Sequence, residues 1–259
     1  MGGIGANNNG ASGGITGVAQ TKQGLSNDAT MEEVVAYFKD NLHMDISNNA
    51  DSLSRFTMIE TSRSIDNLLN ELSEEQINDL FGDKDVKVRY SNYFSTKNGY
   101  YAIAAYETGT DSILVNKKYF GKGQHDSFAK VIANQTSNPD HHFHPLNSTH
   151  ADILSHELGH LMEMHICTKH SPYANYAWNT QEFAKAIVED AWKEVKSQFK
   201  RPDGTKMSKT EAMNTISGYA AKKGKRHETI AEAVSDYAAS GKNANPFSVA
   251  IWKRVKDLL

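Results

Sequence analysis

The sequence predicts an α+β fold in which a small antiparallel sheet is packed with helices that come before and after it. Three strand-like segments, residues 86–94, 99–107 and 112–120, follow one another with only the turn-forming stretches TKNG and TGTD between them. Such short polar turns are typical of antiparallel neighbours. On both sides of this region, apolar residues recur at helical spacing. Strands and helices that occupy separate parts of a chain indicate the α+β class.

The composition is that of a globular protein with no strong electrostatic field. The 259 residues carry a net charge of −3, with 23% charged and 39% hydrophobic residues. This balance gives no reason to expect nucleic acid or an anionic membrane as a partner, and no apolar run approaches the roughly 20 residues that span a bilayer. A single cysteine, Cys167, excludes an intramolecular disulfide and a Cys-rich zinc site.

The first 28 residues differ from the rest of the chain. Residues 1–28 are rich in Gly, Asn and Ser and contain only Lys22 and Asp28 as charges. We expect a flexible arm, or an extension that orders on a partner, followed by one domain at residues 29–259. The stretch lacks the basic start and apolar core of a secretory signal, so we expect a cytoplasmic protein.

The helices of the N-terminal half have recognisable ends. Thr30 followed by Glu33 forms a capping box before a helix with Val34, Val35 and Phe38 on one face. Residues 51–81 predict one or two more helices that end at Gly82, and residues 126–135 predict a short one after the strands.

The C-terminal half is predicted to be mostly helical. Helices are expected at residues 149–167, 180–199 and 226–240, with a short one after the capping pair Ser208 and Glu211 and a last one from Pro246 onwards. The stretch Arg201–Gly204 is expected to end the helix at 180–199, and Gly241 the helix at 226–240.

The stretch SHELGHLMEMH, at residues 155–165, is a candidate metal site. His156 and His160 are four residues apart and project from one face of a helix, so their imidazoles can meet one Zn²⁺ at about 2.0–2.1 Å. Glu157 points elsewhere and is placed to reach a water on the metal. A catalytic zinc takes a third protein ligand and leaves the fourth position for water.

The third ligand is not the histidine of an extended HExxHxxGxxH motif, because Ile166 stands where that histidine would be. We expect His165 and His170 to be solvated residues at the helix end. The helix at 226–240 offers Glu228, Glu232 and Asp236 one turn apart on one face. One of these carboxylates can bind zinc while the next anchors a ligating imidazole.

The HELGH segment and the later ETIAEAVSDY resemble the zinc metallopeptidases (gluzincins) that include the catalytic domain of anthrax lethal factor. They are also similar to metallopeptidase-like domains of phage minor head proteins. The resemblance covers about residues 31–259, although only the two motifs are specific. It implies a zincin-like fold, Glu228 as zinc ligand, Glu232 as the carboxylate that supports a ligand, and Tyr219 beside the oxyanion.

A rival register remains open. EAVSD also resembles the Glu-x-x-x-Asp of thermolysin-type enzymes, which would make Glu232 the ligand and Asp236 its supporter; we favour Glu228. The histidine-rich loop HHFHP, residues 141–145, is interpreted as polar surface, with a second metal site or a shield over the cleft as alternatives. Cys167 is expected to be a core residue at a helix end.

These observations predict a zinc-dependent endopeptidase that acts on a protein or peptide substrate. Glu157 would be the general base, Tyr219 and zinc would stabilise the oxyanion, and the substrate would lie along an edge of the 86–120 sheet. The resemblance implies association with phage heads, with capsid proteins as partners and the host cytoplasm or the virion as location. The alternatives are a virion structural protein that keeps the zinc fold without turnover and, third, a secreted effector.

Overall fold

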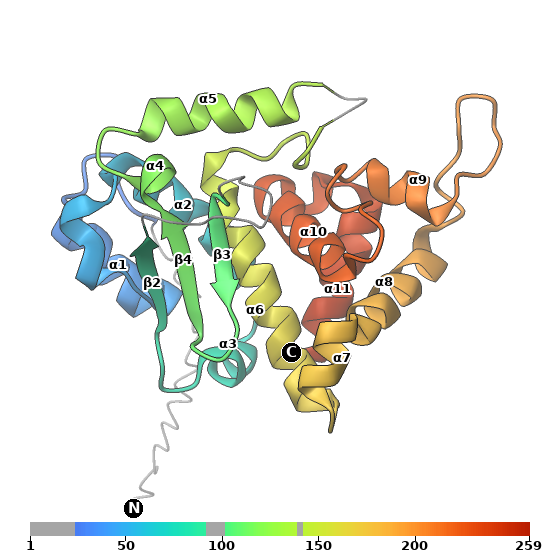
Figure 1. Cartoon of the computed structure of the whole chain (residues 1–259), viewed down its shortest axis with the longest axis horizontal. Coiled ribbons are helices and arrows are strands. Elements are labelled where there is room, and N and C mark those ends of the chain that lie inside the picture. The colour runs from blue at the N-terminus through green and yellow to red at the C-terminus, as the bar shows by residue number, and fades with distance from the viewer. Residues whose placement is uncertain (1–23, 92–101, 139–141) are drawn as a thin grey trace, which may run out of the picture.

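A computed structural model describes residues 24–91, 102–138 and 142–259 of the chain. A small sheet lies beside a larger group of helices, and the long helix α6 runs between them (Figure 1). The strands are β1 (Met44–Asp45), β2 (Val86–Ser91), β3 (Ala104–Glu107) and β4 (Ser112–Asn116). The α-helices are α1 (Met31–Leu42), α2 (Arg55–Leu69), α3 (Glu74–Phe81), α4 (Lys117–Phe120), α5 (His125–Thr136), α6 (Ile153–His170), α7 (Ala174–Thr180), α8 (Glu182–Val195), α9 (Lys209–Asn214), α10 (Arg226–Ser240) and α11 (Pro246–Leu258). Three 3-10 turns, η1 (Ser47–Ser52), η2 (His150–Asp152) and η3 (Gly241–Asn243), complete the described elements.

The sheet is mixed, so the prediction of an antiparallel sheet was wrong in part. Its strand order is β1-β2-β4-β3, with β1, β2 and β4 parallel and only β3 antiparallel to its neighbour β4. The strand β4 is the most apolar of the described strands and is buried at four of its five positions. Continuously apolar strands belong in the interior of a sheet. Therefore β4 lies between β2 and β3.

The end of one strand differs from the prediction, and two short elements were not predicted. The segment expected as a strand at 112–120 leaves the sheet at Asn116, whose side chain accepts a 2.9 Å hydrogen bond from the backbone N–H of Lys118 and so caps α4. The two-residue strand β1 and the short helix α7 were not predicted. Residues 92–94 and 99–101 of the predicted strands, and 1–23 of the predicted arm, lie outside the described residues.

The predicted helix ends are largely confirmed. The capping boxes at Thr30 and Ser208 are both formed with their glutamates. Gly82 and Gly241 terminate α3 and α10 at positive φ, 56° and 55°, a conformation that glycine adopts without steric cost. Pro246 occupies the first turn of α11. Within the described ranges, none of the helices has both the length and the apolar character that crossing a bilayer requires.

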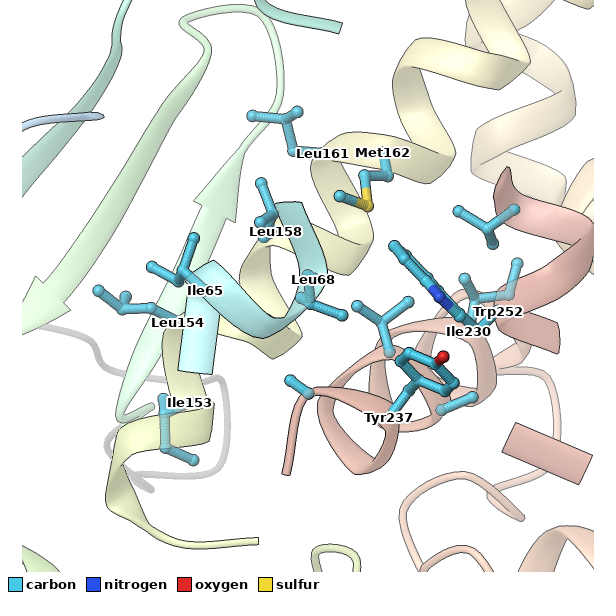
Figure 2. Packing of buried hydrophobic residues seen from close by; sticks show 14 of the residues in the cluster. Ile65, Leu68, Ile153, Leu154, Leu158, Leu161, Met162, Ile230, Tyr237 and Trp252 are labelled. Carbon is cyan, nitrogen blue, oxygen red and sulfur yellow. The ribbon is translucent and has the colours of Figure 1, made fainter. Parts of the chain in front are cut away.

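The helix α6 forms the centre of the core. Of its eighteen residues, thirteen are buried, from Ile153 to Cys167. Figure 2 shows its apolar side chains packed against α2 through Ile65 and Leu68, and against α10 and α11 through Ile230, Tyr237 and Trp252. Hydrophobic burial on every side explains why this helix lacks the polar stripe of a surface helix.

Gly159 sets the distance between α6 and α10. A Cβ at this position would lie 2.9 Å from the Cα of Ala231 and 3.1 Å from the Cβ of Val234. The first of these contacts is with backbone and cannot be relieved by a side-chain rotation. Because the side chain of Gly159 is a single hydrogen atom, α6 and α10 can come into direct contact at this position.

We predict that Gly159→Ala destabilises the fold although it replaces glycine inside a helix. Without the contact, alanine would stabilise the helix by up to about 1 kcal/mol. With it, α10 must move away, and we expect a loss of about 1–3 kcal/mol in the free energy of unfolding, typical of overpacking. Urea denaturation measures this. A variant as stable as the wild type or more so would contradict the close approach of the two helices.

Candidate metal centre

Two imidazoles of α6 and one carboxylate of α10 converge at the Gly159 contact. Glu228 Oε2 lies 3.4 Å from His156 Nε2 and 3.2 Å from His160 Nε2. Two ligand atoms that are each about 2.0–2.1 Å from a tetrahedral ion are about 3.3–3.4 Å apart. The three side chains are buried, at 7, 8 and 7% exposure. Their spacing and donor types therefore fit one zinc ion.

The local sequence explains how these groups meet. One helical turn separates His156 from His160, so both rings project from one face of α6. Glu228, 68 residues after His160, lies in the first turn of α10. Because α10 touches α6 at Gly159, a glutamate in this turn reaches both histidines.

Glu232 lies behind the first histidine, one turn further along α10. Its Oε1 atom is 3.0 Å from His156 Nδ1 and 3.2 Å from His144 Nδ1, and the side chain is fully buried. A carboxylate on the far nitrogen of a ligating imidazole fixes the ring's orientation and tautomer. Asp236 is one turn further again and accepts a 2.9 Å hydrogen bond from the Asn245 backbone N–H, so it ties α10 to the start of α11.

The neighbouring imidazoles keep these buried carboxylates ionised. Burial would raise the pKa of Glu228, but the interactions with His156, His160 and His227 outweigh it and hold that pKa below its ordinary value. Burial would also raise the pKa of Glu232, but His144 and His156 outweigh it and lower that pKa to about 2. Ionised carboxylates are the form that a metal binds.

Glu157 points away from the two histidines and toward the sheet. Its Oε2 atom accepts a 2.6 Å hydrogen bond from the backbone N–H of Tyr106 on β3. The edge strand of the sheet therefore orients this carboxylate, next to the candidate ligands.

Tyr219 contacts Oε1 of Glu228, the oxygen that does not face His156 and His160. Its hydroxyl donates a 2.9 Å hydrogen bond to Glu228 Oε1, and His227 Nε2 is 3.3 Å from the same atom. Burial, and then the charge of Glu228, raise the pKa of the Tyr219 hydroxyl, so it remains a donor at neutral pH. Its ring stacks on Phe143 with centroids 4.9 Å apart.

A cleft of about 770 Å³ opens over these groups. Along one side it is lined by residues 102–106, which lead into and begin the edge strand β3. The other side carries the candidate ligands together with Phe143, Trp178, Tyr219 and His227. This volume and mostly apolar lining are typical of a ligand-binding site.

The interpretation of the HHFHP loop as polar surface was wrong, and one histidine near Glu228 was missed. The HHFHP loop is not simply polar surface, because His142 and His144 are buried and His144 contacts Glu232; His141 lies outside the described residues. His227 was not singled out, although its position next to Glu228 could have indicated it.

Three other expectations can be compared with the structure directly. The rings of His165 and His170 point away from the centre, to Asp79 and to the Leu258 carbonyl. Cys167 is fully buried, which confirms its expected place in the core.

Glu163, one turn after His160, is a buried acid that the sequence did not reveal. It is fully buried, and neither carboxyl oxygen has a hydrogen-bond partner among the described residues. Burial and then the charge of Glu228 raise its pKa to about 8. It is therefore protonated at neutral pH, unlike Glu228 and Glu232 on α10.

No protein-family model, curated protein or solved structure matches the chain.

The two registers for the third ligand make opposite predictions about zinc binding. If Glu228 is the ligand, Glu228→Ala contains one zinc fewer per chain than the wild type, while Glu232→Ala weakens zinc binding at this centre about 10–100-fold, the usual effect of losing a supporting carboxylate. Metal analysis after dialysis against a zinc buffer measures both, with Glu182→Ala on the exposed start of α8 as control. Wild-type zinc content in Glu228→Ala together with the loss of one zinc per chain in Glu232→Ala would establish the rival register.

We predict that Glu163→Gln removes a pH-dependent cost of folding. Between pH 4.5 and about 8 the unfolded chain releases this proton while the folded chain retains it, so wild-type stability falls as pH rises. In chelator, the variant should gain about 1.4 kcal/mol per pH unit over the wild type across this range. Denaturation at several pH values tests this, with Glu182→Gln as control. A difference that does not change with pH would contradict a protonated Glu163.

Proposed function

We propose that the protein is a zinc-dependent endopeptidase. The convergence of His156, His160 and Glu228 on one point beside a cleft carries the proposal. Three protein ligands leave one position of a tetrahedral ion for water, which is the catalytic arrangement, whereas closed structural sites use four.

The residues of the chain supply the remaining chemistry. A zinc ion held by these three residues would lower the pKa of a water molecule to about 7 and would polarise a substrate carbonyl. Glu157 is the general base: its carboxylate takes a proton from the attacking water and passes it to the nitrogen of the leaving amine. The hydrogen bond from Tyr106 to Glu157 Oε2 orients the group for this transfer. The Tyr219 hydroxyl, a donor in the same cleft, would stabilise the developing negative charge on the carbonyl oxygen.

The edge strand β3 supports an extended peptide as the substrate. The Ile103 carbonyl accepts a hydrogen bond from the Asn116 N–H, so Ile103 and every second residue after it face β4. Ala104 and Tyr106 therefore present their backbone polar groups to the cleft. Tyr106 N–H is used by Glu157, which leaves the N–H and carbonyl of Ala104 to pair with a substrate main chain.

The physiological substrate is a protein. Recognition through main-chain hydrogen bonds along β3 does not depend on side-chain sequence, so it is compatible with many proteins. Because the two motifs are similar to those of phage head proteins, capsid proteins are the first to test.

The experiment that tests the activity is Glu157→Gln. We expect the variant to retain zinc and to lose at least about 10²–10⁴-fold in kcat, the contribution of a positioned general base. Digestion of a peptide library, with zinc measured on the same samples, gives both quantities. Glu107→Gln, on the same edge strand as Tyr106, is the control and should keep its activity.

Full activity in Glu157→Gln would reject this mechanism. A zinc-loaded wild type that cleaves neither itself, nor capsid proteins, nor the library would favour the non-catalytic virion protein.

A further inference from the structure

A second group of metal-ligating side chains lies at the junction of three elements. Glu60 comes from α2, His125 from the first turn of α5, and His150 from η2, which leads directly into α6. Their ligand atoms all lie within 4.8 Å of one another. None of the three lines the cleft.

The spacing of the ligand atoms resembles that in the first centre. Glu60 Oε2 is 3.0 Å from His150 Nε2 and 3.3 Å from His125 Nε2. These values are close to the separation of about 3.3–3.4 Å expected for two ligands of one tetrahedral zinc ion.

His150 provides an independent observation. Its side chain is only 6% exposed, and its Nε2 atom is buried without a hydrogen-bond partner among the described residues, despite the nearby Glu60 carboxylate. A buried polar atom that faces a carboxylate without hydrogen-bonding to it costs free energy, unless something else binds both.

The surroundings of His125 are also those of a ligand. Its Nδ1 atom is 2.9 Å from Asp126 Oδ1. When Nδ1–H donates to this carboxylate, the lone pair of Nε2 is directed toward Glu60, as in carboxylate–histidine–metal arrangements. Phe56 and Phe128 pack edge-on against His125 and His150, respectively, and provide an apolar shell.

We propose that Glu60, His125 and His150 form a second metal site, which binds a divalent transition-metal ion such as Zn²⁺. Two imidazoles and one carboxylate suit zinc and its neighbours, whereas Mg²⁺ and Ca²⁺ prefer oxygen ligands alone. The Glu60 side chain is 42% exposed and that of His125 26%, so an ion can enter from solvent.

The structural consequence of this ion would be to join α2, α5 and η2. The turn η2 is already held at its last residue, Asp152, which accepts a 2.6 Å hydrogen bond from Ser64 on α2. A metal at His150 would add a further connection between α2 and the start of α6, beside the hydrogen bonds of Ser64 with Asp152 and Ser155. A metal bound at this site would therefore fix the start of α6, the helix that carries HELGH. Binding of the metal does not depend on peptidase activity.

The test compares zinc stoichiometry in four proteins: wild type, His125→Ala, Glu60→Gln and His165→Ala. His165 is the matched control, because its side chain is also 26% exposed and its Nε2 also lies near a carboxylate, 3.0 Å from Asp79. Each protein is dialysed against a zinc buffer and its zinc is measured by mass spectrometry. Circular dichroism verifies folding, and Glu60→Gln retains the shape of the site if His125→Ala does not fold.

We expect both site variants to contain one zinc fewer per chain than the wild type and His165→Ala. Zinc should also raise Tm less in the site variants. Equal stoichiometry in all four proteins would overturn the proposal and leave an ordinary histidine–glutamate ion pair. The difference is independent of the first centre: if that centre binds no zinc, the wild type has one ion and the site variants none.

Discussion

The contact between α6 and α10 at Gly159 is the constraint on which the candidate centre depends. It brings the first turn of α10 onto the face of α6 that carries His156 and His160. The start of α6 is held from two sides, because Ser64 on α2 donates to the Asp152 side chain and Ser235 on α10 donates to its carbonyl. Positioned by two packed helices, the three candidate ligands are held more rigidly than they would be on loops.

Burial of charge is the main energetic cost of this arrangement, and the surroundings divide the carboxyl groups into two kinds. Glu228 and Glu232 face imidazoles, which lower their pKa values despite burial. Glu163 faces no such partner, and its pKa is raised to about 8. Glu228 and Glu232 on α10 are therefore ionised, whereas Glu163 on α6 is neutral. Because removing one partner of a buried pair leaves an uncompensated charge, losing either His156 or Glu232 would destabilise the fold as well as the ring orientation.

The sequence predicted what depends on local spacing. The two histidines, the carboxylates of α10 and the helix ends at Thr30, Ser208 and Gly241 are all visible as short patterns. The strand order was not predictable in this way, because turn residues indicate where strands end and not which strands pair. The contact of His144 with Glu232 and the Glu60–His125–His150 group could not be predicted either, because the partners are up to 90 residues apart in the sequence and meet only through packing.

The unpredicted strand order also explains why the sheet can serve the centre. In an antiparallel meander of the three predicted strands, the segment 99–107 would be central and both of its edges would be paired. With β4 in the centre, β3 becomes the edge strand and its outer side faces α6. Only then is the Tyr106 N–H free to donate to Glu157. The apolar character of β4, which places it between β2 and β3, thus has a consequence at the cleft: it leaves the backbone of Ala104 open beside the carboxylate that we propose as general base.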